Sequence, residues 1–251
     1  MTLDRPDRQL RDTMPDMPAE PVEARLRWPS TGSEYRRLEQ TGAPAALRAQ
    51  ILATEHWSLL ATRSMTWSEI FSRTGTFLTV LSAIMLALSL VAQGTGLGQT
   101  FRVFALLVLP IGLLIGLGTY LRLVEADIED VWLITGMNRI RQAYLQLAPD
   151  LDPYFVTSHH DDEAGILQTY SFRRQLGAMH LLSGSPVIVG IIDALLCGVV
   201  AAVATQALGG AVALQVAVGF LAVLGSGTVL GALGHRRLAQ LRRDLRPRFP
   251  S

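Results

Sequence analysis

The stretch PVIVGIIDALLCGVVAAVATQAL, residues 186–208, contains one charged residue, Asp193, in an otherwise apolar run. A helix rises about 1.5 Å per residue, so about 20 apolar residues are needed to cross roughly 30 Å of hydrocarbon. This stretch meets that requirement. We therefore predict a membrane-spanning helix with an acidic side chain inside it, and that prediction decides the fold class.

Three further stretches have the same length and character, at residues 75–93, 103–123 and 211–234. The overall composition agrees, with 49% hydrophobic and only 17% charged residues. Lipid tolerates only segments that satisfy their own backbone hydrogen bonds, so each stretch is predicted to be a helix. Because no alternating strand pattern is visible, we expect an all-α protein with four transmembrane helices.

Arginine is concentrated on one side of these spans. The connection between the first two spans contains only Arg102, and the turn between the last two contains none. The opposite flanks are rich in arginine, at Arg63, Arg73, Arg122, Arg139, Arg141 and six positions within 235–251. The positive-inside rule then predicts two hairpins, 75–93 with 103–123 and 186–208 with 211–234, and places both termini in the cytoplasm. All 22 basic residues are arginine, which is typical of high-GC bacterial genomes, so we predict the bacterial cytoplasmic (inner) membrane.

The remaining segments complete the predicted domain organisation. Residues 1–43 are rich in proline and charge, which predicts a disordered tail without a cleavable signal peptide. Residues 44–123 combine a cytoplasmic helix with the first hairpin, and 124–185 form a cytoplasmic helical region. Residues 186–234 form the second hairpin and 235–251 an arginine-rich cytoplasmic tail. No proline interrupts the first helix before its span, and a helix from 103 to 148 would end at Pro149, so both spans are expected to extend far into the cytoplasm.

The segment SHHDDE, Ser158 to Glu163, is the stretch most similar to a metal or catalytic site. Neighbouring residues of a helix do not face one another, so His159 and His160 cannot ligate one ion from a regular helix. We favour the start of a helix over 161–182, capped by Ser158, with its acids at the positive end of the helix dipole. A metal-binding or proton-sensing role is the alternative. No catalytic motif or cofactor signature is recognisable elsewhere, so we predict neither an enzyme, nor a cofactor, nor a metal site.

Small and polar residues form two kinds of surface on the predicted spans. One face of the first span contains Thr79, Ser82, Ser89 and Gln93, which is typical of a surface that lines water or a neighbouring helix. Small residues at four-residue steps in the other spans predict close helix packing and a homo-oligomer. These residues are Gly112, Gly116, Gly190, Ala194, Gly198, Gly227 and Gly231.

Asp193 is expected near the middle of the membrane. An acid there costs about 2.5–3.5 kcal/mol on insertion scales unless it faces water or partners. Counting along the helices puts Ser82, Gly116 to Thr119, and Ser226 to Thr228 at the same depth. The acid is therefore either a neutral structural group hydrogen-bonded to these hydroxyls, or a functional group that attracts a cation or takes up a proton.

The chain resembles known membrane proteins in three respects. The stretch GMNRIRQAYLQLAPDLDPYFVTSHHDDEAGI, residues 136–166, is similar to segments of uncharacterised bacterial multi-pass membrane proteins. Residues 44–148 resemble in layout the SLATT-type two-span domains, which are associated with bacterial nucleotide-signalled defence and are supposed to form pores. The whole layout is similar to that of bestrophin-type pentameric channels. The first resemblance implies no activity. The SLATT-type and bestrophin-type resemblances carry over no site residue, but both imply a pore.

We therefore predict an oligomeric ion-conducting pore, lined by Thr79, Ser82, Ser89 and Gln93, with Asp193 as its ionisable element and cations slightly favoured. The first alternative is a non-conducting scaffold that binds a cytoplasmic partner or anionic lipid. Its basic tail residues Arg236, Arg237, Arg242 and Arg243 would face the lipid headgroups. The second is a proton-coupled transporter, which would need more buried ionisable groups than the one visible. Membrane lipid, inorganic ions and further copies of the chain are the expected partners. Nucleic acid is not, because the net charge is only +1.

Overall fold

The computed structural model describes residues 44–171 and 185–251, and in these ranges the only regular elements are helices. The chain divides into a first unit, 1–47, and a second, 48–251, and the second contains all four membrane-crossing stretches and their side-chain contacts. The predicted disordered tail, 1–43, lies outside the described residues. So does 172–184, which includes the whole second half of the helix predicted at 161–182.

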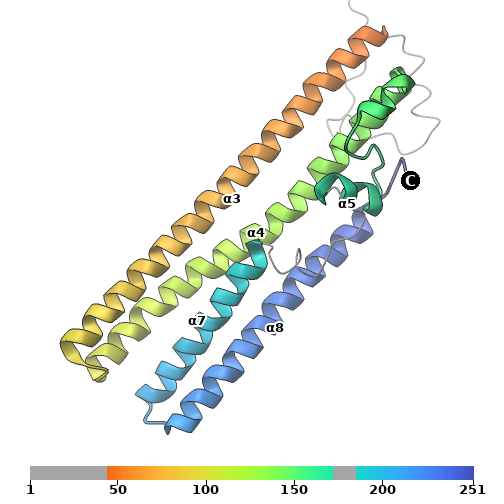
Figure 1. Ribbon diagram of the computed structural model, residues 1–251. Coiled ribbons are helices and arrows are strands. Elements are labelled where there is room, and N and C mark those ends of the chain that lie inside the picture. Colours follow the sequence, from red (N-terminus) through yellow and green to blue (C-terminus); the bar gives the residue numbers. More distant parts are fainter. Residues whose placement is uncertain (1–43, 172–184) are drawn as a thin grey trace, which may run out of the picture. The chain divides into compact units, whose positions relative to one another are not determined.

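Four long helices dominate the described residues (Figure 1). They are α3 (Ala45–Thr95), α4 (Gln99–Leu147), α7 (Ser185–Ala207) and α8 (Val212–Asp244). All four are long and apolar enough to cross a membrane, which makes the chain a multi-pass membrane protein by length and composition. Two short elements follow α4, the 3-10 helix η2 (Pro149–Tyr154) and α5 (Glu163–Ser171).

The helices begin and end where the backbone chemistry requires. The two tight connections each contain a glycine with positive φ, Gly96 (67°) after α3 and Gly209 (82°) after α7, a conformation that other residues rarely adopt. Both α3 and α4 are uninterrupted through their spans into polar extensions, and α4 ends directly before Pro149.

The predicted cap of α5 is wrong. The helix begins at Glu163, and the Asp162 carboxylate accepts the backbone N–H of Gly165 at 2.8 Å. Ser158 instead accepts the N–H of His160 at 3.0 Å, which makes a local turn before the helix. The more strongly accepting, ionised oxygen therefore takes the capping position.

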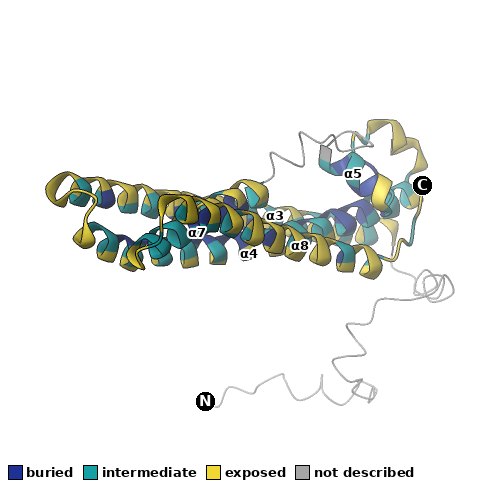
Figure 2. Cartoon of the chain, turned by 90° about the horizontal axis from the view of Figure 1, so that it is seen from below, coloured by how far each residue is buried: buried dark blue, intermediate teal, exposed yellow. Residues whose placement is uncertain are grey.

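Helix α4 lies at the centre of the packing. It contains fourteen buried residues against four in α3, and Figure 2 shows dark blue positions recurring along it. It packs closely on α7, and α7 packs closely on α8. Its contacts with α3 are made by side chains, including ion pairs described below, and Figure 1 shows the two helices running beside each other. This arrangement leaves α3 the least covered of the four spans.

Candidate functional site

Asp193 lies on α7 at the contact with α3 and α4. Its side chain is only 2% exposed. A Cβ added at Gly116 of α4 would collide with the Asp193 carboxylate and would come within 2.8 Å of the Phe77 ring of α3. The acid therefore points into the space that the missing side chain of Gly116 leaves open.

The expected hydroxyl partners of Asp193 bind elsewhere. Ser82 donates to the Leu78 carbonyl at 2.8 Å and Thr119 to the Ile115 carbonyl at 2.8 Å, so each hydroxyl satisfies its own helix. Ser226 and Thr228 of α8 likewise donate to carbonyls of α8. Neither oxygen of Asp193 has a hydrogen-bond partner among the described residues. The hydroxyl clamp predicted from depth alone is therefore not formed.

The polar face of α3 is exposed along its whole length. Gly75, Thr79, Ser82, Ser89 and Gln93 are all exposed, and Thr79 donates to the Gly75 carbonyl at 2.8 Å. The fully buried Phe77 follows Gly75 by two residues, which places it about 200° around the helix. Asp193 and the Phe77 ring both lie beside Gly116, so Asp193 is on that buried side of α3. The structure therefore does not bring Asp193 together with the four residues predicted to line the pore with it.

Most of the small residues predicted at packing positions lie against other helices. A Cβ at Gly112 would lie 3.0 Å from Ile84 of α3, and one at Gly190 would lie 3.1 Å from Tyr120 of α4. Between α7 and α8, Gly198 lies so close to the Gly219 backbone that a Cβ would come within 2.9 Å of its carbonyl oxygen. Ala194 is buried, and a Cβ added at Gly227 would lie 3.8 Å from the Ala194 Cβ. Gly231 has nothing within 4 Å of its Cβ position, so its face of α8 is uncovered within the described chain.

An apolar cavity of about 310 Å³ lies between α3, α4 and α7. Its wall includes Met85 and Ser89 of α3, Phe101 and Leu109 of α4, and Val199 of α7. Ser89 is thus the one residue of the polar face that also borders this cavity. Gln93 does not line it.

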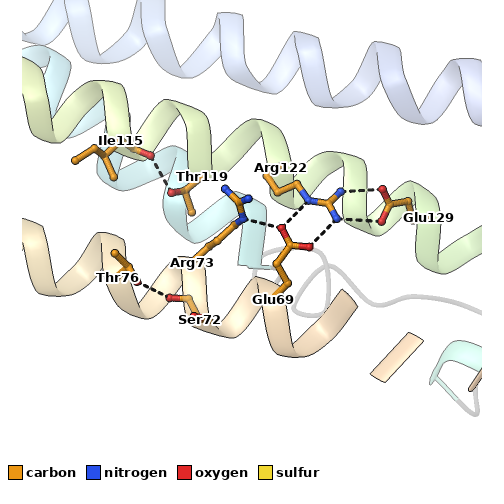
Figure 3. Close-up of polar contacts among 8 residues, drawn as sticks. All are labelled: Glu69, Ser72, Arg73, Thr76, Ile115, Thr119, Arg122 and Glu129. Carbon is orange, nitrogen blue, oxygen red and sulfur yellow. Dashed lines mark hydrogen bonds and ion pairs between the residues drawn. The ribbon is translucent and has the colours of Figure 1, made fainter. Parts of the chain in front are cut away.

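A cluster of charged residues joins α3 and α4 at the polar end of the spans (Figure 3). Glu69 of α3 pairs with Arg73 at 2.7 Å on its own helix and with Arg122 of α4 at 3.0 Å. Arg122 also pairs with Glu129 at 2.8 Å. Hydrogen bonds from Arg122 and Arg73 lower the pKa of Glu69 to about 2, so this carboxylate is ionised at every physiological pH. The cluster therefore links α3 to α4 at this level of the two helices.

Asp130 makes a second link between the polar extensions of these helices. It is 1% exposed and accepts Arg63 Nε at 2.6 Å and Trp67 Nε1 at 3.2 Å. Asp127 lies one turn before it, and burial, together with the charge of Asp130, raises the pKa of Asp127 to about 6. This group therefore titrates just below neutral pH.

The SHHDDE segment binds the last residues of the chain. The buried Asp161 accepts Arg139 Nε at 2.7 Å and the backbone N–H groups of Arg248 at 2.9 Å and Phe249 at 2.7 Å. The neighbouring Asp162 accepts both the N–H and the hydroxyl of Ser251, at 2.9 and 2.7 Å. These acids therefore attach residues 248–251 to α4 and α5.

The rest of the segment also has partners within the chain. Glu163 pairs with Arg242 of α8 at 2.9 Å, and His159 lies 3.6 Å from Asp152. Over the described ranges, no group of three His, Cys, Asp or Glu residues is arranged to hold a metal. Arg236, Arg237 and Arg243 are exposed on the same polar end of α8, as is Arg242.

Sequence reasoning missed two of these groups. The signal for Asp130 was present, because Ala126, Ile134 and Met137 share its helical face and are buried with it. An acid on the apolar face of an extension predicts a buried partner. The attachment of residues 248–251 has no comparable signal, since the donors are backbone N–H groups.

Chemically, the membrane part of the site offers one buried acid and one exposed row of hydroxyl and amide groups, on opposite sides of α3.

Comparison of the chain with protein-family models, with curated proteins and with solved structures finds no match.

Proposed function

We propose that this protein is an oligomeric ion-conducting pore of the bacterial inner membrane, lined by the polar face of α3. In this proposal the spans pair as two hairpins, α3 with α4 and α7 with α8, and both termini are cytoplasmic. The observation that carries the proposal is the exposure of Thr79, Ser82, Ser89 and Gln93, none of which packs in the interior of the chain.

The burial of the four spans supports a central position for α3. Only 6% of the most apolar stretch of α3 is buried, against 11% in α8, 22% in α4 and 28% in α7. Lipid offers no hydrogen bonds to a polar helix face. If several copies of the chain surrounded an axis, the polar face of each α3 would instead face water in a central pore. Hydroxyl oxygens that donate to their own helix keep lone pairs, and these can replace part of the hydration of a passing cation.

The same face continues outside the membrane and supports self-association. Trp57 is 70% exposed and lies on the helical face of Gly75, about 27 Å before it along α3. Lipid cannot cover an indole at that distance from the span. A second copy of α3 in an oligomer would cover it and would continue the contact into the membrane.

The scaffold alternative has weaker support. The acids of SHHDDE would be the natural contact for a cytoplasmic partner, but Asp161, Asp162 and Glu163 already bind residues of the same chain. The exposed Arg236, Arg237, Arg242 and Arg243 are compatible with anionic lipid headgroups, and a pore would use that contact equally well.

Cysteine accessibility in a conducting preparation tests the pore. The purified full-length chain, with Cys197→Ala to remove its only cysteine, is reconstituted into liposomes and its cation flux is measured. Ser82→Cys and Ser89→Cys are then treated with a charged methanethiosulfonate reagent, which should reduce the flux severalfold. Val216→Cys, at an exposed apolar position of α8, is the matched control and should leave the flux unchanged. Absence of flux at every ionic composition and pH, or equal inhibition at Val216, would refute the proposal.

A further inference from the structure

The unpartnered carboxyl of Asp193 is the feature of this structure that the pore does not use. It lies on the buried side of α3 rather than on the exposed polar face. Both its oxygens are buried and without a hydrogen-bond partner in the described part of the chain. Other buried acids are paired, as Asp130 is with Arg63 and Asp161 with Arg139, so Asp193 differs from them in kind.

The helices around Asp193 supply no charge. Gly116 of α4 and the Phe77 ring of α3 lie beside it, and the nearby contacts of α8 are apolar, with Gly227 next to Ala194 and Leu230 near Gly190. The titratable group in this layer is Tyr120 of α4, which packs on Gly190 one turn from Asp193 and donates its hydroxyl to the Leu230 carbonyl at 2.7 Å. Cys197, one turn further along α7, is half-buried. Within the described residues, 44–171 and 185–251, Asp193 forms no ion pair.

These surroundings favour the neutral form of the carboxyl. An isolated ionised carboxylate in an apolar interior loses its hydration without compensation, and this costs far more than burying the neutral acid. The penalty is larger inside a bilayer, where water can reach the charge only if helices separate. Ionisation therefore disfavours the close approach of α7 to Gly116 and favours an arrangement in which water reaches the carboxylate.

We propose that Asp193 is a proton-binding site inside the membrane, occupied at neutral pH, and that release of its proton separates α7 from α3 and α4 at Gly116. The proton is the ligand, and the packed and the hydrated arrangements of α7 are the two states that it controls. This proposal does not require ion conduction, because the proton acts on the packing within one copy of the chain.

The protonation state is tested first, on the wild-type chain in liposomes at pH 7. Infrared spectroscopy should show the C=O band of a protonated carboxyl that shifts in D₂O, and Asp193→Asn should lack it. Asn has nearly the same shape, and circular dichroism of the variant verifies that it folds. Absence of the band from the wild type at pH 7 would overturn the proposal.

Chemical labelling identifies the residue. The O–H of a protonated carboxyl adds across a C=N bond of dicyclohexylcarbodiimide, and the O-acylisourea rearranges to a stable N-acylurea with no leaving group. Mass spectrometry should find this adduct on Asp193, and its yield should fall about tenfold per pH unit once the proton is released. Asp130, buried but paired with Arg63, is the internal control and should remain unlabelled. Labelling of Asp193 that does not change with pH would contradict the proposal.

The separation of α7 is measured with the native Cys197, the only cysteine of the chain. The rate of maleimide labelling is compared between the wild type and Asp193→Asn at the same pH, so that the titration of the thiol cancels in the ratio. The ratio should be near one at pH 6 and should rise severalfold towards pH 9. A constant ratio would show that proton release does not move α7 and would refute the second half of the proposal, whatever the liposome flux.

Discussion

Gly116→Ala is the substitution that tests the membrane site most directly. The added Cβ would collide with the Asp193 carboxyl and lie 2.8 Å from the Phe77 ring, so α7, α3 or both must move. Overpacking of this kind costs about 1–3 kcal/mol of stability. The higher helix propensity of alanine offsets at most about 1 kcal/mol of this cost. We expect a net loss of about 1–2 kcal/mol, or roughly a 5- to 30-fold shift in the folding equilibrium.

Gly118→Ala is the matched control, two residues away on the same helix. No atom lies within 4 Å of its Cβ position, so the substitution should be neutral or slightly stabilising. Unfolding of the purified chain is followed in mixed micelles by tryptophan fluorescence as denaturing detergent is added.

A double-mutant cycle isolates the contact between Gly116 and Asp193. Truncation of the acid in Asp193→Ala makes room for the new methyl group, so Gly116→Ala should cost at least about 0.5 kcal/mol less in that background. Equal costs at Gly116 and Gly118, or additive effects of Gly116→Ala and Asp193→Ala, would show that Asp193 does not occupy the space beside Gly116.

Three further predictions concern the polar end of the molecule. Asp130→Ala should destabilise the chain by about 2–3 kcal/mol in thermal unfolding, because it leaves Arg63 and Trp67 without this partner. Glu129→Ala is the control and should cost under about 1 kcal/mol, because it removes only an exposed partner of Arg122. Asp127→Asn should stabilise the chain by about 1–3 kcal/mol at pH 7 and have no effect below about pH 4. The pKa of Asp127, raised to about 6, means that the folded chain binds this proton more tightly than the unfolded chain, so the stability of the wild type falls as the pH rises from about 4 to 6. A stability difference that does not change with pH would contradict this. Asp161→Asn should speed tryptic cleavage after Arg248 severalfold, because it weakens the hydrogen bonds to the backbone of Arg248 and Phe249. Asp150→Asn, which changes an exposed acid, should leave the cleavage rate unchanged. Equal cleavage rates in the two variants would show that Asp161 does not hold this segment.

The helices of this chain could be predicted because each rests on a local property. Apolar runs of sufficient length predict the spans, and the break at Pro149 predicts the end of α4 at Leu147. The depth of Asp193 could also be predicted, because rise per residue places it level with Gly116. Its partners could not. Depth says nothing about rotation of the helices about their axes, and rotation directs the hydroxyls of Ser82 and Thr119 to their own backbones and presents Phe77 instead.

The polar end shows the same division between local and distant information. The acids of SHHDDE correctly predicted the start of a helix near Glu163. Their attachment to Arg248 and Phe249 joins segments 87 and 88 residues apart through backbone donors, which every residue except proline possesses. Such a contact has no compositional pattern.

The pairing of Gly116 with Asp193 connects stability with function. An acid near the middle of a span costs about 2.5–3.5 kcal/mol on insertion scales. In the described residues no hydrogen bond or ion pair to Asp193 offsets that cost. Leucine at position 193 would avoid the cost of burying an acid, although it would fill the space beside Gly116 and require that space to be repacked. The chain thus has a polar group at a position where packing alone would favour an apolar one. A group whose charged and neutral forms require different packing gives the chain two states, which an apolar side chain at this position could not provide.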